Sequence, residues 1–75
     1  MRPAMNQDPL SACYHQLPEV SREQLKGRPI AGHWRERSGM LEGCRYGGAW
    51  HPLRGAERGP GGTLLVGGMI LVPEG

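Results

Sequence analysis

The sequence contains no phenylalanine, and the scarcity of aromatic residues limits the core that it can build. Aromatic side chains make up 5% of its 75 residues, and they include two tryptophans. A domain of this length buries only roughly 60% of its unfolded surface, so one small domain is all that it can support. We expect Trp34 and Trp50 to anchor its core.

The sequence also lacks an apolar run long enough to cross a membrane. The length of its most apolar stretch, TLLVGGMILV, is about half of the roughly twenty residues that a membrane-spanning helix needs. The N-terminal residues include prolines and an aspartate where a secretory signal has a continuous apolar segment. We therefore expect a cytoplasmic protein with no membrane contact. Cys13 and Cys44 are then free thiols, whereas secretion would allow a disulfide between them.

Motifs of the common catalytic sites are absent. There is no glycine-flanked nucleophilic serine, no glycine loop followed by Lys-Ser or Lys-Thr, and no cluster of paired carboxylates. A Cys44 thiol with His33 or His51 as a base is conceivable, but almost any small protein with these residues offers such a pair. So small a domain also has difficulty enclosing a water-excluding pocket. We predict that the protein is not an enzyme and uses no cofactor.

A zinc site is the metal site to consider, because Cys13, His15, Cys44 and His51 are suitable ligand types. Structural zinc sites usually present two close pairs of ligands, and here only Cys13 and His15 are close in sequence. We therefore predict no metal site, while convergence of these four residues stays open as an alternative.

Glycine and proline are abundant instead, with thirteen and seven copies. Both residues oppose long helices, so the composition favours short strands joined by turns. The fold class predicted is mainly β, or small α+β. A short N-terminal capped helix precedes an antiparallel meander or partial barrel of three to five strands. Residues 1–9 are predicted to form a flexible tail, and residues 10–75 a single β-rich domain.

The helix is predicted from LPEVSREQLKG. Ser21 and Gln24 have the spacing of a capping box, in which each side chain can bond the other residue's backbone N–H. Val20 can pack on Leu25 across this cap, and Gly27 ends the turn. The helix is too short to be stable alone and must be held by packing.

The following residues predict an antiparallel meander. Alternation in RPIAGHWRER places Ile30, Gly32 and Trp34 on one face and Ala31, His33 and Arg35 on the other. Ser38-Gly39 is a candidate two-residue turn, after which MLEGCRY returns, with a further break at Gly47-Gly48. Pro52 limits the next strand to an edge. Residues 54–62, rich in glycine, are predicted to be a mobile loop.

The stretch from Thr63 to Val72 is apolar on both alternating faces. Gly67-Gly68 is compatible with a hairpin turn or with a bulge in one bent strand. Both faces of this stretch must be covered. Either a second molecule covers one of them, or the stretch is the core strand of a small barrel. The first alternative predicts self-association, since an uncovered apolar strand recruits another. Its interface residues are Leu64, Val66, Ile70 and Val72.

Arginines and aromatic residues alternate with glycines in CRYGGAWHPLRGAERGPGG, which makes this stretch the best candidate for binding a partner. Its candidate partner-binding residues are Arg45, Tyr46, Trp50, Arg54 and Arg58. Tyrosine, tryptophan and arginine are the residues enriched at protein-binding hot spots. The function predicted is a non-enzymatic protein-interaction module, such as a small inhibitor, adaptor or assembly subunit.

Nucleic-acid binding is the alternative function. Aromatic rings can stack on bases while arginines hold phosphates. This function would use Tyr46 or Trp50 as the stacking platform, with Arg35, Arg37, Arg45, Arg54 and Arg58. The formal net charge of +2 is too small to identify such a binder.

Overall fold

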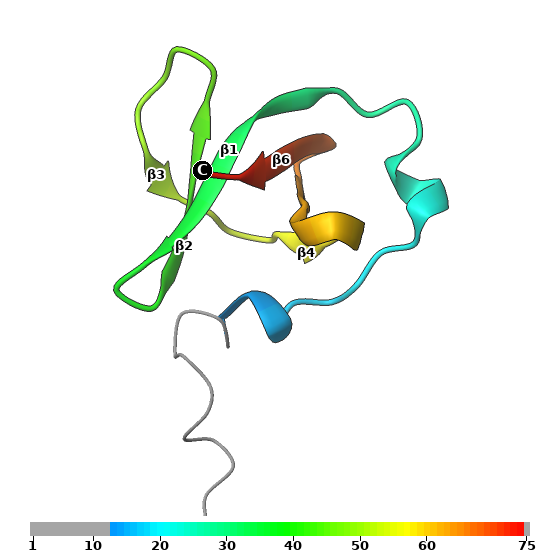
Figure 1. Cartoon of the computed structure of the whole chain (residues 1–75), viewed down its shortest axis with the longest axis horizontal. Helices are drawn as coiled ribbons and strands as arrows, with labels where there is room; N and C mark the ends of the chain where they lie inside the picture. Colours follow the sequence, from blue (N-terminus) through cyan, green and yellow to red (C-terminus); the bar gives the residue numbers. More distant parts are fainter. Residues whose placement is uncertain (1–12, 75) are drawn as a thin grey trace, which may run out of the picture.

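The computed structural model describes residues 13–74, which form one sheet curled into a half-barrel (Figure 1). The strands are β1 (Ile30–Arg37), β2 (Met40–Arg45), β3 (His51–Pro52), β4 (Glu57–Arg58), β5 (Leu64–Val66) and β6 (Met69–Pro73). They are arranged in the order β3-β2-β1-β6-β5-β4. The predicted mainly β fold is confirmed. The six strands of the described part exceed the expected three to five because β3 and β4 are each only two residues long.

Two tight turns build the hairpins. Ser38 and Gly39 connect β1 to β2 with φ angles of 53° and 77°. Gly67 and Gly68 connect β5 to β6 with φ angles of 56° and 82°. Positive φ at both central residues is the geometry of the two-residue turn that matches the twist of antiparallel strands. The first turn was predicted, and the second identifies the C-terminal stretch as a hairpin.

One pairing departs from the expected antiparallel meander: β6 lies parallel to β1 (Figure 1). The chain leaves β3, forms β4 and β5 at the far side of the sheet, and only then places β6 beside β1. Consequently β6 is hydrogen-bonded on both sides and occupies the interior of the sheet. An interior strand is where a run that is apolar on both faces can be covered.

Each face of the β5–β6 hairpin is covered by a separate hydrophobic cluster. On the inner face Trp34, Leu64 and Leu71 are buried together, with Tyr14 and Leu17 packed against them. On the other face the buried cluster consists of Val20, Leu65 and Ile70, with Leu25 packed against it. The chain thus covers its own apolar hairpin with residues that precede β1. Of the two tryptophans expected to anchor the core, Trp34 does so, whereas Trp50 belongs to neither buried cluster.

The predicted capped helix is present as a single 3-10 turn, Arg22–Leu25, with its capping box. The backbone N–H of Ser21 donates to Oε1 of Gln24 over 2.9 Å. Residues 13–15 are also helical. No helix in residues 13–74 has the length and apolar character needed to span a bilayer. The predicted tail, residues 1–9, lies outside the described part of the chain.

Residues 54–62, which were predicted to be a mobile loop, contain regular structure from Glu57 onward. Within this segment, β4 pairs with β5, Ala56 and Gly59 are buried, and Pro60–Gly62 form a 3-10 turn. On the edge of β4 that does not pair with β5, the N–H of Arg58 donates to the carbonyl of Pro18, and the N–H of Val20 donates to the carbonyl of Arg58. Partners distant in the sequence therefore create this edge strand, and local composition cannot reveal them.

Candidate functional site

The outer surface of β1 and β2 carries a band of aromatic and basic side chains. Residues directly opposite each other in an antiparallel pair share a face, so Arg35 lies beside Glu42 and His33 beside Cys44. Trp34 and Gly43, which alternate with them, face the inner cluster instead. We call the residues His33, Arg35, Tyr46 and Trp50 the outer band.

Arg35 is at the centre of the outer band and is fixed by two partners. Its Nε donates to Oε1 of Glu42 over 2.8 Å, and both side chains are only 22% exposed. Its guanidinium carbon lies 4.0 Å from the centroid of the Trp50 ring. A guanidinium over an indole face is attracted by the ring's quadrupole. Trp50 is therefore held against the outer face in a defined position, although it is only half-buried.

Tyr46 continues the outer band toward the other end of β1. Its ring meets His33 edge-on, with centroids 5.6 Å apart and planes at 80°. Tyr46 is 63% exposed, so most of its ring is accessible to a partner. Since His33 and Arg35 are two residues apart on one strand, Tyr46, His33, Arg35 and Trp50 follow one another across the surface.

The five predicted partner-binding residues do not form one surface. Tyr46 and Trp50 belong to the outer band, but Arg45 lies on the inner face beside Met69. Arg58 is turned toward the inner cluster, where its guanidinium lies 3.7 Å from a Glu19 carboxylate oxygen and 5.8 Å from the Tyr14 ring centroid. Arg54 is exposed in the segment after β3.

Sequence reasoning missed His33 as a member of the band. Alternation along β1 had placed it on the same face as Arg35, and that signal was sufficient to include it.

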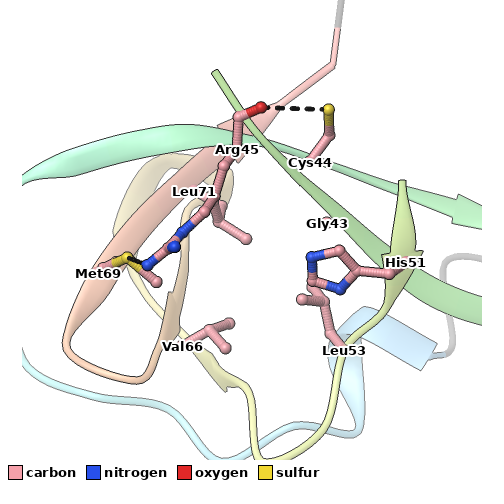
Figure 2. Close-up of a pocket in the computed structure, with 8 residues that line it drawn as sticks. All are labelled: Gly43, Cys44, Arg45, His51, Leu53, Val66, Met69 and Leu71. Atoms are coloured by element: carbon pink, nitrogen blue, oxygen red, sulfur yellow. Dashed lines mark hydrogen bonds between the residues drawn. The ribbon is translucent and has the colours of Figure 1, made fainter. Parts of the chain in front are cut away.

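The inner face has a small pocket of about 50 Å³ between β2–β3 and the β5–β6 hairpin (Figure 2). Leu53, Val66 and Leu71 form its apolar wall, and Arg45 and His51 lie at its opening. The lining of this pocket combines apolar side chains with an arginine and a histidine. No acidic residue is among the described residues that line it.

Residues 13–74 contain no group of three or more His, Cys, Asp or Glu side chains that could hold a metal ion. The possible zinc ligands are separated along β2: the Cys13 thiol donates to the carbonyl of Gly39 at one end, and the Cys44 thiol to that of Gly48 beyond the other. Both cysteines are free.

The four residues expected at a self-association interface belong mainly to the chain's own interior. Leu64 is completely buried and Ile70 is 8% exposed, whereas Val66 and Val72 are half-buried. The premise of an uncovered strand is wrong, because β5 and β6 are both paired on each side. Self-association itself stays a prediction, and Val66 and Val72 are the residues of this set with surface left to contribute.

Comparison with known proteins adds no relative to this description: no family model, no curated protein and no solved structure matches the chain.

Proposed function

We propose that this protein is a non-enzymatic protein-interaction module that binds its partner through the outer band. It would act as a small inhibitor, adaptor or assembly subunit. The observation that carries the proposal is the exposed Tyr46 in line with a Trp50 ring held by Arg35. Rigid aromatic side chains that lose little freedom on binding, next to an arginine, are the usual anchors of protein interfaces.

The arrangement of charge favours a protein partner over a nucleic acid. The Arg35 guanidinium is already bonded to Glu42, and that of Arg58 lies near Glu19. Arg45 lies on the opposite face. Arg35, Arg45 and Arg58 thus do not line a common groove, which a binder of single strands would need for its phosphate contacts.

The inner pocket itself is too small to enclose a small-molecule substrate or a cofactor. At about 50 Å³ it is far smaller than the roughly 300–1,000 Å³ of pockets that hold small-molecule substrates or cofactors. Two free thiols in so small a chain support a reducing compartment, such as the cytoplasm, as the place of action.

Affinity capture from a native lysate tests the proposal, with captured proteins quantified by mass spectrometry. The wild-type protein is expected to retain a stoichiometric protein partner. Tyr46→Ala and Trp50→Ala are expected to reduce its recovery at least about tenfold, because truncating a hot-spot residue costs about 2 kcal/mol or more. Arg22→Ala is the matched control, since Arg22 is exposed on the 3-10 turn away from the outer band.

Circular dichroism must show that the variants stay folded. If all variants recovered the partner equally, the outer band would not be the surface that binds it. Binding of labelled single strands or duplexes that weakens steeply with salt would instead favour the nucleic-acid function.

A further inference from the structure

The inner pocket is formed by close packing around a glycine in β2. A Cβ built on Gly43 would lie 2.6 Å from Cδ2 of Leu53 and 3.0 Å from Cδ1 of Leu71. Any side chain at this position would therefore push both leucines outward. Glycine lets them meet the sheet directly, and Val66 of the β5–β6 hairpin supplies the remaining apolar wall (Figure 2).

Arg45 brings a charge to this pocket that the described residues do not neutralise. Its Nη2 donates to the sulfur of Met69 over 2.9 Å. A thioether is a weak acceptor without charge, so most of the guanidinium's donors have no partner within residues 13–74. Arg35 and Arg58, in contrast, each lie within ion-pair distance of a glutamate.

His51 faces Arg45 across the opening and adds a second nitrogen donor or acceptor (Figure 2). No aspartate or glutamate is among the lining residues. The pocket thus combines a neutral apolar interior with an electropositive opening, and its chemical complement is an apolar group that carries a carboxylate.

The volume of the pocket limits the size of that apolar group. About 50 Å³ of free space accommodates part or all of one aliphatic side chain, and neither a helix nor a cofactor. Because Arg45 itself lines the pocket, the carboxylate must lie within a few ångströms of the buried side chain. A C-terminal residue satisfies this condition, since its α-carboxylate and its side chain are attached to the same carbon.

We propose that the pocket binds the C-terminal residue of a partner polypeptide, with an aliphatic side chain against Leu53, Val66 and Leu71 and the terminal carboxylate on Arg45. This inference rests on the proposed function, because it names a second contact with a protein partner on the face opposite the outer band. Arg45 forms paired charge-assisted hydrogen bonds to the carboxylate. His51 contributes a further polar contact at the opening.

A terminal residue fits better than an internal peptide segment. An internal extended segment gains affinity by pairing with a free strand edge. The neighbouring edge strand, β3, has two residues, and one of them is Pro52, which has no N–H to donate. A terminal residue needs no such ladder, because its recognition depends on one side chain and one carboxylate.

The test uses two fluorescein-labelled six-residue peptides ending in leucine, identical except that one has a free carboxylate and the other a C-terminal amide. Binding to the full chain is measured by fluorescence anisotropy. The free acid is expected to bind at least about tenfold more tightly than the amide, because hydrogen bonds to charged groups are worth about 1.5–3 kcal/mol. A third peptide ending in serine is expected to bind as weakly as the amide.

Arg45→Gln is the decisive variant, since it removes the charge from an exposed side chain and retains hydrogen-bonding groups. It is expected to bind the acid and the amide equally weakly. Arg54→Gln is the matched control and should retain the difference, because Arg54 is exposed and does not line the pocket. Val66→Phe fills the pocket and should weaken the free acid further. If that variant does not fold, Arg45→Gln still decides.

Equal affinity for acid and amide in the wild-type protein would overturn the proposal, as would full retention of the difference by Arg45→Gln. Absence of binding at millimolar peptide would overturn it as well. Trp50→Ala separates this result from the fate of the proposed function. A Trp50-dependent protein partner in a chain that binds no peptide would uphold the outer band and reject the pocket.

Discussion

Tyr14 stacks on Trp34 with ring centroids 5.1 Å apart and planes only 2° from parallel. The Tyr14 hydroxyl donates to the carbonyl of Gly59 over 3.0 Å. One side chain from the helical residues 13–15 therefore contacts β1 and the segment that follows β4. Tyr14 is therefore part of the inner cluster and links it to both of these segments.

Removing this stack should cost a large part of the stability of so small a domain. Tyr14→Ala is expected to lower the free energy of unfolding by about 3 kcal/mol, because it deletes an aromatic ring from the cluster. Tyr14→Phe keeps the ring and loses only the hydrogen bond, so about 1 kcal/mol is expected. Urea unfolding measures both. Tyr46→Ala is the control and should stay within about 0.5 kcal/mol, as its side chain is mostly exposed.

The same hydroxyl predicts a pH dependence. Burial is the main cause that raises the pKa of Tyr14 above its usual 10.0; Arg58 opposes this shift and Glu19 adds to it. A raised folded-state pKa means that the stabilisation is complete below the unfolded pKa and is lost as pH rises through the folded pKa. Above about pH 10 the wild-type protein should therefore lose stability relative to Tyr14→Phe. Parallel curves from pH 8 to 11 would contradict this expectation.

The two glycines of the β5–β6 turn should respond differently to substitution. Gly67→Asn is expected to be nearly neutral, because asparagine tolerates positive φ and Asn-Gly suits this turn. Gly68→Ala should cost about 1–2 kcal/mol, since its φ of 82° is unfavourable for a residue with a Cβ. Thermal unfolding of the two variants checks the order, and equal losses would mean that the turn has another geometry.

The hairpin also allows a test of self-association. Ile70→Lys should unfold the chain, because it places a charge in the cluster of Val20 and Leu65 at a cost of about 3 kcal/mol or more. Val66→Lys should stay folded, as its half-buried position lets the long side chain reach water. If copies associate through this hairpin, sedimentation should show a wild-type oligomer that Val66→Lys dissociates. A wild-type protein that stays monomeric at high concentration would end the hypothesis.

Local signals were sufficient to predict much of the fold. Ser38-Gly39 identified a turn because glycine adopts positive φ readily, and Ser21 with Gln24 identified a cap because its hydrogen bonds lie within four residues. The parallel β1–β6 pair and the strand β4 could not be predicted in this way. Their hydrogen-bond partners are distant in sequence: the N–H of Arg58 donates to the carbonyl of Pro18, and the N–H of Ile70 to that of Pro29.

The candidate site was predictable only in part for a related reason. Composition selected Tyr46 and Trp50, but whether an arginine serves binding or folding depends on what it meets. Among residues 13–74, Arg35 meets Glu42 and an indole ring, Arg58 meets Glu19, and the Arg45 guanidinium donates to a thioether. Those partners follow from strand register and from the curl of the sheet, which the residue pattern alone does not determine.

The parallel pairing of β6 with β1 has a consequence for the order of events during synthesis. The strands β1, β2 and β3 leave the ribosome first. The edge of β1 that does not pair with β2 has no partner until the hairpin that ends at Pro73 has emerged. Pairings between distant segments form slowly, and a sheet with an open edge is prone to associate with other chains. Until that hairpin pairs with β1, Trp34 lacks the cover of Leu64 and Leu71, and the unpaired edge of β1 can recruit another chain.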